Sequence, residues 1–125
     1  MAECNPVNWF EIPATDLDRA KTFYERALGL ELSAAEMFGL QMVFFPMQQG
    51  GPGAGGALVK SPRHQPAAVG TTVYFSVSDL DAALARVEAN GGTVISPKTS
   101  IGEHGYIAHF RDTEGNGVAL HSMAG

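Results

Sequence analysis

The chain repeats itself at about half its length. The Asp-Leu-Asp tripeptide that begins at Asp16 recurs at Asp79, 63 residues later in a chain of 125, and Gly29 matches Gly92 at the same spacing. An apolar segment precedes each tripeptide. Repetition on this scale indicates two copies of one supersecondary unit, neither of which can bury its own apolar face alone. We therefore expect any functional site to draw residues from both copies.

Composition bounds the class of protein. The length predicts one domain over residues 1–125, with a first module at about 6–60, a linker at 61–70 and a second module at about 71–122. A hydrophobic content of 45% can supply a core, and a net charge of −5 disfavours nucleic acid as a partner. No apolar run is long enough to span a membrane. Cys4 is the single cysteine and the N-terminus lacks a signal peptide, so we expect a cytoplasmic protein.

Local patterns predict the elements of the first copy. Residues 7–12 are expected to form a strand that Pro13 ends, because proline cannot donate to a sheet ladder. Asp16 is suited to cap a helix whose apolar residues recur at helical spacing until Gly29, a residue typical of helix C-termini. Strands are predicted at 31–35, 40–45 and 57–60, and the glycine-rich residues 50–56 are predicted to form a loop.

The second copy repeats this plan. A strand is expected over 71–77, a helix capped by Asp79 follows, and the Asn-Gly-Gly sequence at 90–92 should end it. Further strands are predicted at 93–95, 106–111 and 117–121. Residues 112–116 are rich in turn-forming residues and should join the last two strands as a hairpin. The pattern βαβββ therefore occurs twice, which predicts an α+β fold with mixed sheets.

Two segments carry a resemblance to a known family. The segment from Asp16 to Gly29 (Asp-Leu-Asp-Arg-Ala-Lys-Thr-Phe-Tyr-Glu-Arg-Ala-Leu-Gly) resembles the first helix of the vicinal oxygen chelate (VOC) superfamily, which includes glyoxalases, bleomycin-resistance proteins and extradiol dioxygenases. Residues 105–121 resemble its C-terminal hairpin, with Asp-Thr-Glu-Gly-Asn at 112–116 in place of the usual Asp-Pro-Asp-Gly-Asn. The resemblance implies two βαβββ modules that form a curled mixed sheet around an open cup, and a homodimer.

Metal-dependent members of this superfamily chelate a divalent ion with His, Gln or Glu at four strand positions. The corresponding positions in this chain are Trp9, Thr72, Ala119 and about Ala57. Indole and alanine offer no lone pair to a metal, and threonine is a poor ligand. We therefore expect no metal at the usual site and no cofactor. The resemblance implies the fold without the metal-dependent isomerase or dioxygenase mechanism.

The cup-facing residues follow from strand alternation, which places every second side chain on the same face. If the four metal positions face the cup, so do their neighbours two residues along each strand. The hairpin centred near Glu114 also sets His109 beside Ala119. The predicted small-molecule site therefore consists of Trp9, Glu11, Thr72, Tyr74, His109 and His121.

Two of these residues are candidates for catalysis. Dioxygenase relatives place an acid/base group at the hairpin position that corresponds to His109, and a carboxylate such as Glu11 can orient an imidazole for proton transfer. Other interpretations stay open. Trp9 could belong to the core, Glu11 to a solvated face, and His109 to a structural hydrogen bond. His64 and His104 fall in predicted loops and are expected to be solvated.

Three functions remain in competition. The leading one is a metal-independent, glyoxalase-like protein that binds a small organic molecule in the cup, with acid/base chemistry on a carbonyl or hydroxyl compound left open. The second is a non-enzymatic protein that sequesters a small molecule, as bleomycin-resistance proteins do. The third is a metal-dependent lyase or dioxygenase with relocated ligands from Glu11, His109 and His121.

Overall fold

The order of elements agrees with the predicted double βαβββ pattern. Within residues 5–37, 39–48 and 50–124, which the computed structural model describes, the chain forms eight strands, two α-helices and one short 3₁₀ helix. Cys4 lies outside this part. The elements are β1 (Trp9–Pro13), α1 (Leu17–Leu28), β2 (Ser33–Met37), β3 (Leu40–Phe44), β4 (Gly55–Lys60), β5 (Tyr74–Ser76), α2 (Leu80–Ala89), β6 (Thr93–Ser100), η1 (Gly102–His104), β7 (Tyr106–Arg111) and β8 (Gly117–Ser122).

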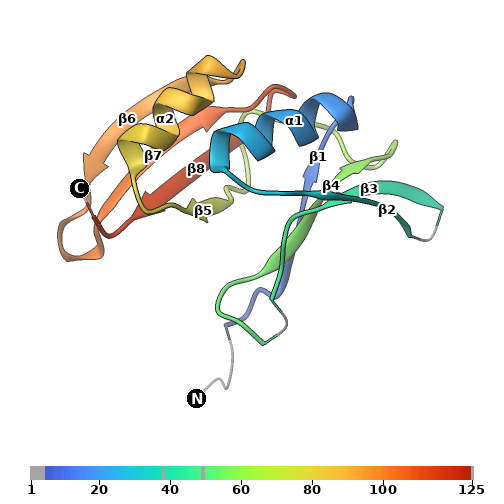
Figure 1. Cartoon of the computed structure of the whole chain (residues 1–125), viewed down its shortest axis with the longest axis horizontal. Helices are drawn as coiled ribbons and strands as arrows, with labels where there is room; N and C mark the ends of the chain where they lie inside the picture. Colours follow the sequence, from blue (N-terminus) through green and yellow to red (C-terminus); the bar gives the residue numbers. More distant parts are fainter. Residues whose placement is uncertain (1–4, 38, 49, 125) are drawn as a thin grey trace.

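Each module builds its own mixed sheet (Figure 1). The strand orders are β1-β4-β3-β2 in the first module and β5-β8-β7-β6 in the second. In both modules the first strand pairs parallel with the last, and the remaining pairs are antiparallel. The predicted α+β fold with two βαβββ modules is therefore confirmed.

The two helices begin with the same capping geometry. Asp16 accepts a hydrogen bond from the backbone N–H of Arg19, and Asp79 accepts one from that of Ala82, each at 3.0 Å. Both caps have extended backbone angles, with φ of −131°. These bonds satisfy backbone donors that the first turn leaves unpaired. At the end of α1, Gly29 adopts a φ of 67°, a conformation in which a side chain would be strained.

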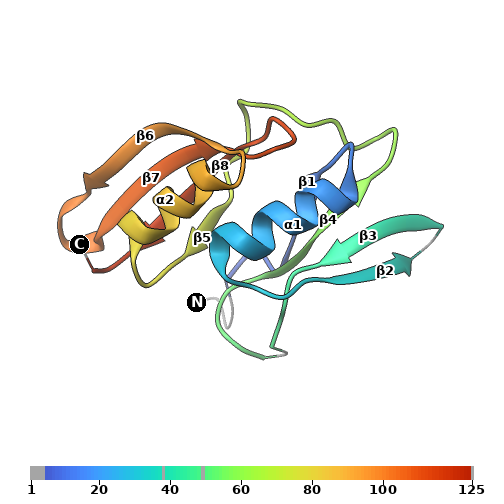
Figure 2. The ribbon, with the colours of Figure 1, turned by 45° about the horizontal axis from the view of Figure 1, so that its top comes forward.

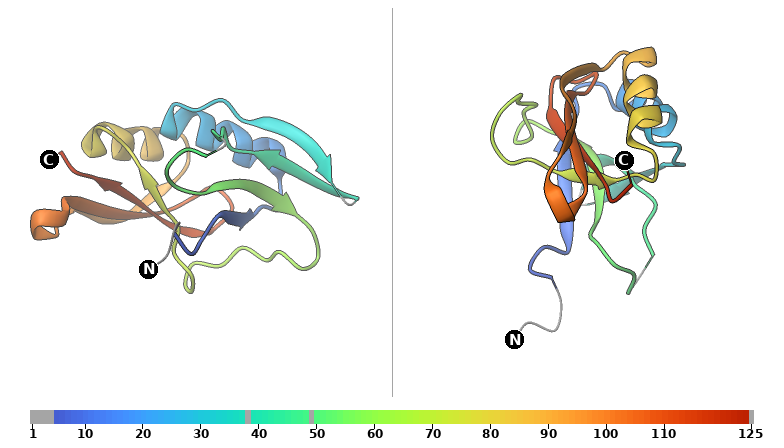
Figure 3. Two further views of the ribbon diagram at one scale, coloured as in Figure 1. Left: turned by 90° about the horizontal axis from the view of Figure 1, so that it is seen from below. Right: turned by 90° about the vertical axis from the view of Figure 1, so that its left-hand side faces the viewer.

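The helices of both modules lie side by side over one continuous core (Figure 2). Phe75 of the second module packs against Phe10, Tyr24 and Phe45 of the first, with ring centroids 5.2–5.7 Å apart. Figure 3 shows both helices on one side of the sheets, with the connection between the modules on the other. Each sheet therefore buries one face under a helix and turns the other face, here called the open face, away from the helices.

Most strand boundaries differ from the prediction by one or two residues, including that of β1, which contains Pro13; β5 and β6 differ by more. β5 begins at Tyr74 rather than at residue 71, so Thr72 lies in the connection that precedes the strand. β6 extends to Ser100 and contains Pro97, because its pairing with β7 has register shifts and its other edge is unpaired. Proline is tolerated at such edge positions and irregularities. No helix among the described residues has the length and apolarity to cross a membrane.

Candidate functional site

The open face of the first sheet is an apolar floor. Met42, Ala57 and Val59 form a buried cluster, with Leu40 and Phe44 packed against it. This cluster is separate from the main core under the helices. The parallel register pairs Glu11 with Ala57, which places a carboxylate directly beside this floor.

Glu11 is held by two side chains on this face. Its Oε1 lies 2.7 Å from Nε2 of His64, and its Oε2 accepts a hydrogen bond of 3.2 Å from the indole N–H of Trp9. These hydrogen bonds, that from His64 foremost, lower the pKa of the Glu11 carboxyl. The Trp9 ring also packs edge-on against Phe44 at 5.8 Å. Trp9 and Glu11 are thus neighbours, as strand alternation predicts.

The expectation that His64 is simply solvated is wrong. Its side chain is only 22% exposed, and it bonds to both Glu11 and Ser61. The sequence offered no sign of this contact, because 53 residues separate His64 from Glu11 and the linker brings them together.

The open face of the second sheet holds the other predicted residues. The register pairs Tyr74 with Ala119, His109 with Ala119 and Ile107 with His121. Tyr74 and His109 therefore flank the same alanine, with the tyrosine oxygen 3.4 Å from Nε2 of His109. Their rings contact each other edge-on at 5.8 Å. The predicted hairpin register around His109 agrees with this pairing.

His121 is engaged elsewhere. Its Nε2 lies 2.6 Å from the backbone carbonyl oxygen of His104, in the 3₁₀ segment before β7. Because a carbonyl oxygen can only accept, this nitrogen carries a proton and donates. Thr72 is exposed, and its hydroxyl contacts the carbonyl oxygen of Gly70 at 3.5 Å.

The predicted site residues thus fall into two groups. Trp9 and Glu11 belong to the first sheet, whereas Tyr74, His109 and His121 belong to the second. No hydrogen bond or ring contact in the described part of the chain joins the two groups. Five cavities lined by described residues likewise contain no member of the second group. Within one chain the two groups of predicted residues therefore lie on separate open faces.

The positions that bind metal in relatives do not fit a metal here. Ala57 and Ala119 occupy equivalent places in the two modules, opposite Glu11 and Tyr74, and both are fully buried. Their methyl groups offer no electron pair to a cation. Among the described residues, no group of three or more His, Cys, Asp or Glu side chains has a geometry that could hold a metal ion.

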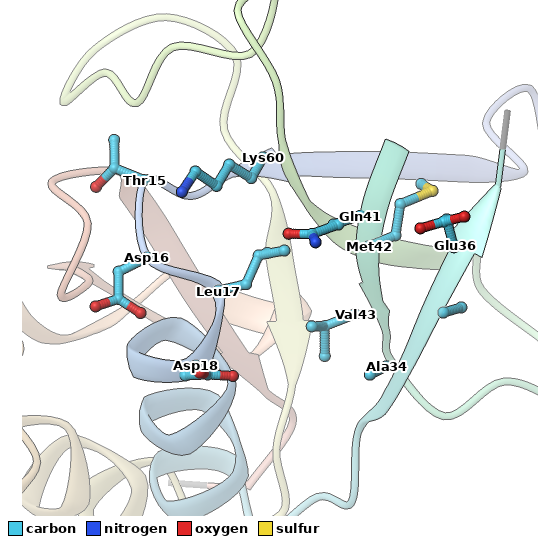
Figure 4. A pocket seen from close by; sticks show the side chains of 11 residues that line it. Thr15, Asp16, Leu17, Asp18, Ala34, Glu36, Gln41, Met42, Val43 and Lys60 are labelled. Carbon is cyan, nitrogen blue, oxygen red and sulfur yellow. The ribbon is translucent and has the colours of Figure 1, made fainter. Parts of the chain in front are cut away.

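Two cavities do not coincide with the predicted site, although Trp9 borders one of them. One, of about 770 Å³, lies between the start of α1 and the β2–β3 hairpin; Figure 4 shows the side chains of Leu17, Gln41 and Lys60 among those that line it. The other, of about 780 Å³, lies beside Trp9 and is lined largely by the glycine-rich loop. No sequence motif marks either cavity, because each draws its lining from several separate segments.

Comparison with known proteins agrees with this architecture. The sequence model of the Glyoxalase/Bleomycin resistance protein/Dioxygenase superfamily matches residues 7–120. A glyoxylase-like domain-containing protein of Didymella fabae is 30% identical over 130 residues, covering 95% of this chain and 94% of that protein.

Solved structures show the same fold. A glyoxalase/bleomycin resistance protein from Albidiferax ferrireducens T118 superposes with a TM-score of 0.72 at 23% identity, covering 93% of this chain and 97% of that one. TnmS3, an antibiotic binding protein from Streptomyces sp. CB03234, superposes with a TM-score of 0.68 at 24% identity, covering 98% of each chain. The chain belongs to the Glyoxalase/Bleomycin resistance protein/Dioxygenase superfamily.

Proposed function

We propose that the protein binds a small organic molecule on the open faces of its two sheets. The observation that carries this proposal is the exposure of aromatic side chains on those faces: Trp9 is 37% exposed and Tyr74 is 49% exposed. Each lies beside a polar group, Glu11 or His109. Apolar surface with a few polar groups is typical of small-molecule sites.

Binding is proposed to require a homodimer. Among the described residues no contact joins the predicted residues of one open face to those of the other, so each face would supply half of a site. A second copy related by a two-fold axis could place one half-site against the other. Light scattering should then report a dimer at micromolar concentrations, and a monomer across that range would contradict this part of the proposal. A cytoplasmic location likewise stays a prediction.

Acid/base chemistry is the proposed extension of binding. His109 is the candidate for proton transfer to a carbonyl or hydroxyl compound, because Tyr74 contacts its Nε2 and its ring lies on the open face. Within one chain Glu11 is hydrogen-bonded to Trp9 and His64. A carboxylate that orients His109, as the sequence suggested for Glu11, would therefore have to be Glu11 of the partner subunit. Without a metal ion, proton transfer in this chemistry rests on the His109 imidazole.

Sequestration without turnover is the second candidate. TnmS3 is described as an antibiotic binding protein, and it covers 98% of this chain in superposition. A metal-dependent lyase or dioxygenase is the least supported candidate, because His121 donates to a backbone carbonyl and Glu11 is occupied by two donors.

A thermal-shift screen against aromatic, carbonyl and hydroxyl compounds tests the binding proposal. Stabilising compounds should lose affinity in Trp9→Ala and Tyr74→Ala, whereas Met123→Ala, which removes an exposed apolar side chain beyond the end of β8, should bind normally. Affinity that survives both aromatic substitutions would overturn the proposed location.

His109→Ala then separates the two leading functions. If the protein is an enzyme, this variant should lose turnover of a screened compound and keep its affinity. If the protein only sequesters its ligand, wild-type protein should return the compound unchanged, and His109→Ala should show weaker binding. Metal analysis of protein purified without chelator tests the third function, which predicts a stoichiometric metal ion.

A further inference from the structure

A second cluster of reactive side chains lies where β4 leaves the first sheet. Ser61 follows the last residue of β4 and forms an isolated antiparallel bridge with His64. The backbone N–H of His64 donates to the carbonyl oxygen of Ser61 at 3.1 Å, and that of Arg63 donates to its Oγ at 3.1 Å. The tight turn thus fixes the serine hydroxyl beside the imidazole.

One hydrogen-bond chain runs from this hydroxyl to the sheet. Ser61 Oγ lies 2.7 Å from Nδ1 of His64, and Nε2 of His64 lies 2.7 Å from Oε1 of Glu11. A serine, a histidine and a carboxylate within hydrogen-bond reach, in that order, are the arrangement that activates a serine nucleophile.

A single tautomer of His64 satisfies both hydrogen bonds of its ring. With its proton on Nε2, neutral His64 donates to Glu11 and leaves the Nδ1 lone pair to accept from the Ser61 hydroxyl. The opposite tautomer would set a nitrogen lone pair against a carboxylate oxygen. The low pKa of Glu11 keeps that oxygen charged, so the productive tautomer is favoured. The second Glu11 oxygen is fixed by Trp9.

The hydrogen-bonded cluster of Ser61, His64 and Glu11 borders a cavity. Both Ser61 and His64 line a groove of about 550 Å³, which is large enough for a small ester. Lys60 and the amide-bearing Gln41 and Gln65 line the same groove and supply positive charge and N–H donors. Lys60 and Gln41 also border the adjacent cavity, where Figure 4 shows the lysine side chain extending toward Thr15.

We propose that this cluster transfers acyl groups from small carboxylic esters, with Ser61 as nucleophile, His64 as general base and Glu11 as the residue that positions the imidazole. Ser61 Oγ attacks the ester carbonyl carbon while its proton passes to His64 Nδ1. When the carbonyl re-forms, the bond to the alcohol oxygen breaks, and that oxygen takes the proton from His64. Water then attacks the acyl-serine by the same route and releases the carboxylic acid.

The activity needs only residues of the first module and its linker. It does not depend on the open face of the second sheet or on a ligand bound there. Covalent labelling measures the acyl-transfer activity, and thermal shift measures ligand binding. A negative result for one proposal is therefore distinguishable from a negative result for the other.

The test uses the full-length protein with 4-nitrophenyl acetate and a fluorophosphonate probe. Wild type should form one covalent adduct per chain, located on Ser61 by peptide mass mapping, and should release nitrophenolate. Ser61→Ala should abolish both signals. Ser78→Ala is the matched control, because Ser78 lies in the connection before α2 and away from the groove, and it should react as wild type does.

The proposed roles of His64 and Glu11 are tested by separate measurements. His64→Gln should slow labelling by about 100-fold or more, the usual contribution of a general base. Glu11→Gln keeps an acceptor for His64 but loses the charge that stabilises the imidazolium, so kcat should fall while KM changes little. An adduct on Lys60 or elsewhere, no adduct at all, or full reactivity in His64→Gln would overturn the proposal. If Ser61→Ala fails to fold, the mapped position of the wild-type adduct decides the question alone.

Discussion

The Glu114 carboxylate accepts hydrogen bonds from three residues near the start of α1. Its Oε1 accepts from the backbone N–H groups of Thr15 and Asp16 at 2.9 Å each, and its Oε2 lies 2.7 Å from Nε of Arg19. The Glu114 side chain is fully buried, although that of Arg19 is half exposed. Glu114, in the β7–β8 turn of the second module, therefore links that module to the first through hydrogen bonds.

Glu114→Gln should destabilise the protein. The amide keeps the shape of the side chain but loses the charge to which several N–H and O–H groups donate, and hydrogen bonds to a charged group contribute about 1.5–3 kcal/mol. The free energy of unfolding, measured by urea denaturation, should fall by about that amount. Glu103→Gln makes the same substitution on a side chain that is 89% exposed and should change little. Equal stability of the two variants would contradict this role.

The same residue should make stability depend on acid pH. Hydrogen bonds from Arg19, Asp16 and Thr15 outweigh the opposing effect of burial and lower the pKa of Glu114 from 4.5 to about 2. A lowered pKa in the folded state means that the stabilisation is complete above about pH 4.5 and is lost as pH falls toward 2. The melting temperature of wild type should drop across this window more steeply than that of Glu114→Gln. Melting temperatures of wild type and Glu114→Gln that fall in parallel with pH would contradict this role of Glu114.

At the scale of elements, the two helices share one design at their N-termini. Asp16 and Asp79 have nearly identical backbone angles and the same hydrogen bond to the third residue of the helix. Such caps depend only on a few neighbouring residues, which is why the sequence repeat revealed both of them. Strand β5 was harder to delimit, because its first predicted residues belong instead to the connection.

Removing the cap of α2 should cost about 0.5–2 kcal/mol. Asp79→Ala leaves the N–H of Ala82 without its acceptor, so the melting temperature should fall. Asp18→Ala changes an acidic residue in the first turn of α1 that makes no capping bond, and it should cost less. A smaller effect of Asp79→Ala than of Asp18→Ala would contradict the capping interpretation.

At the scale of the whole molecule, the modules are joined through helix packing and the β7–β8 turn. The guanidinium Nε of Arg86 in α2 donates to the carbonyl oxygen of Ala27 in α1 at 3.0 Å. Tyr24 of α1 donates its buried hydroxyl to Asp112 at 2.6 Å, and burial raises the pKa of this tyrosine. Asn116 donates to the carbonyl oxygen of Pro13 at 2.7 Å. These contacts fix the modules in one arrangement.

Gly92 lies where a side chain would have no room, between α2 of its own module and α1 of the first. A Cβ at this position would lie 2.7 Å from Cγ1 of Val87 and 2.9 Å from Cε1 of Phe23. Gly92→Ala should therefore lower the free energy of unfolding by about 1–3 kcal/mol, as overpacking does. In a double-mutant cycle, Val87→Ala should cost less in the Gly92→Ala background than in wild type. Strictly additive effects would show that the clash is not the cause.

The sequence by itself determined the two modules, the helix caps, the hairpin register that sets His109 beside Ala119, and the alanines at the metal positions. These features follow from short-range rules of capping, alternation and turn formation. Only the tertiary structure decided which distant residues meet. It joined His64 to Glu11 across 53 residues and Glu114 to Thr15 across 99, and it left Trp9 and His109 on separate open faces. Such contacts depend on the path of the linker and on how the two modules pack, and no local pattern encodes either.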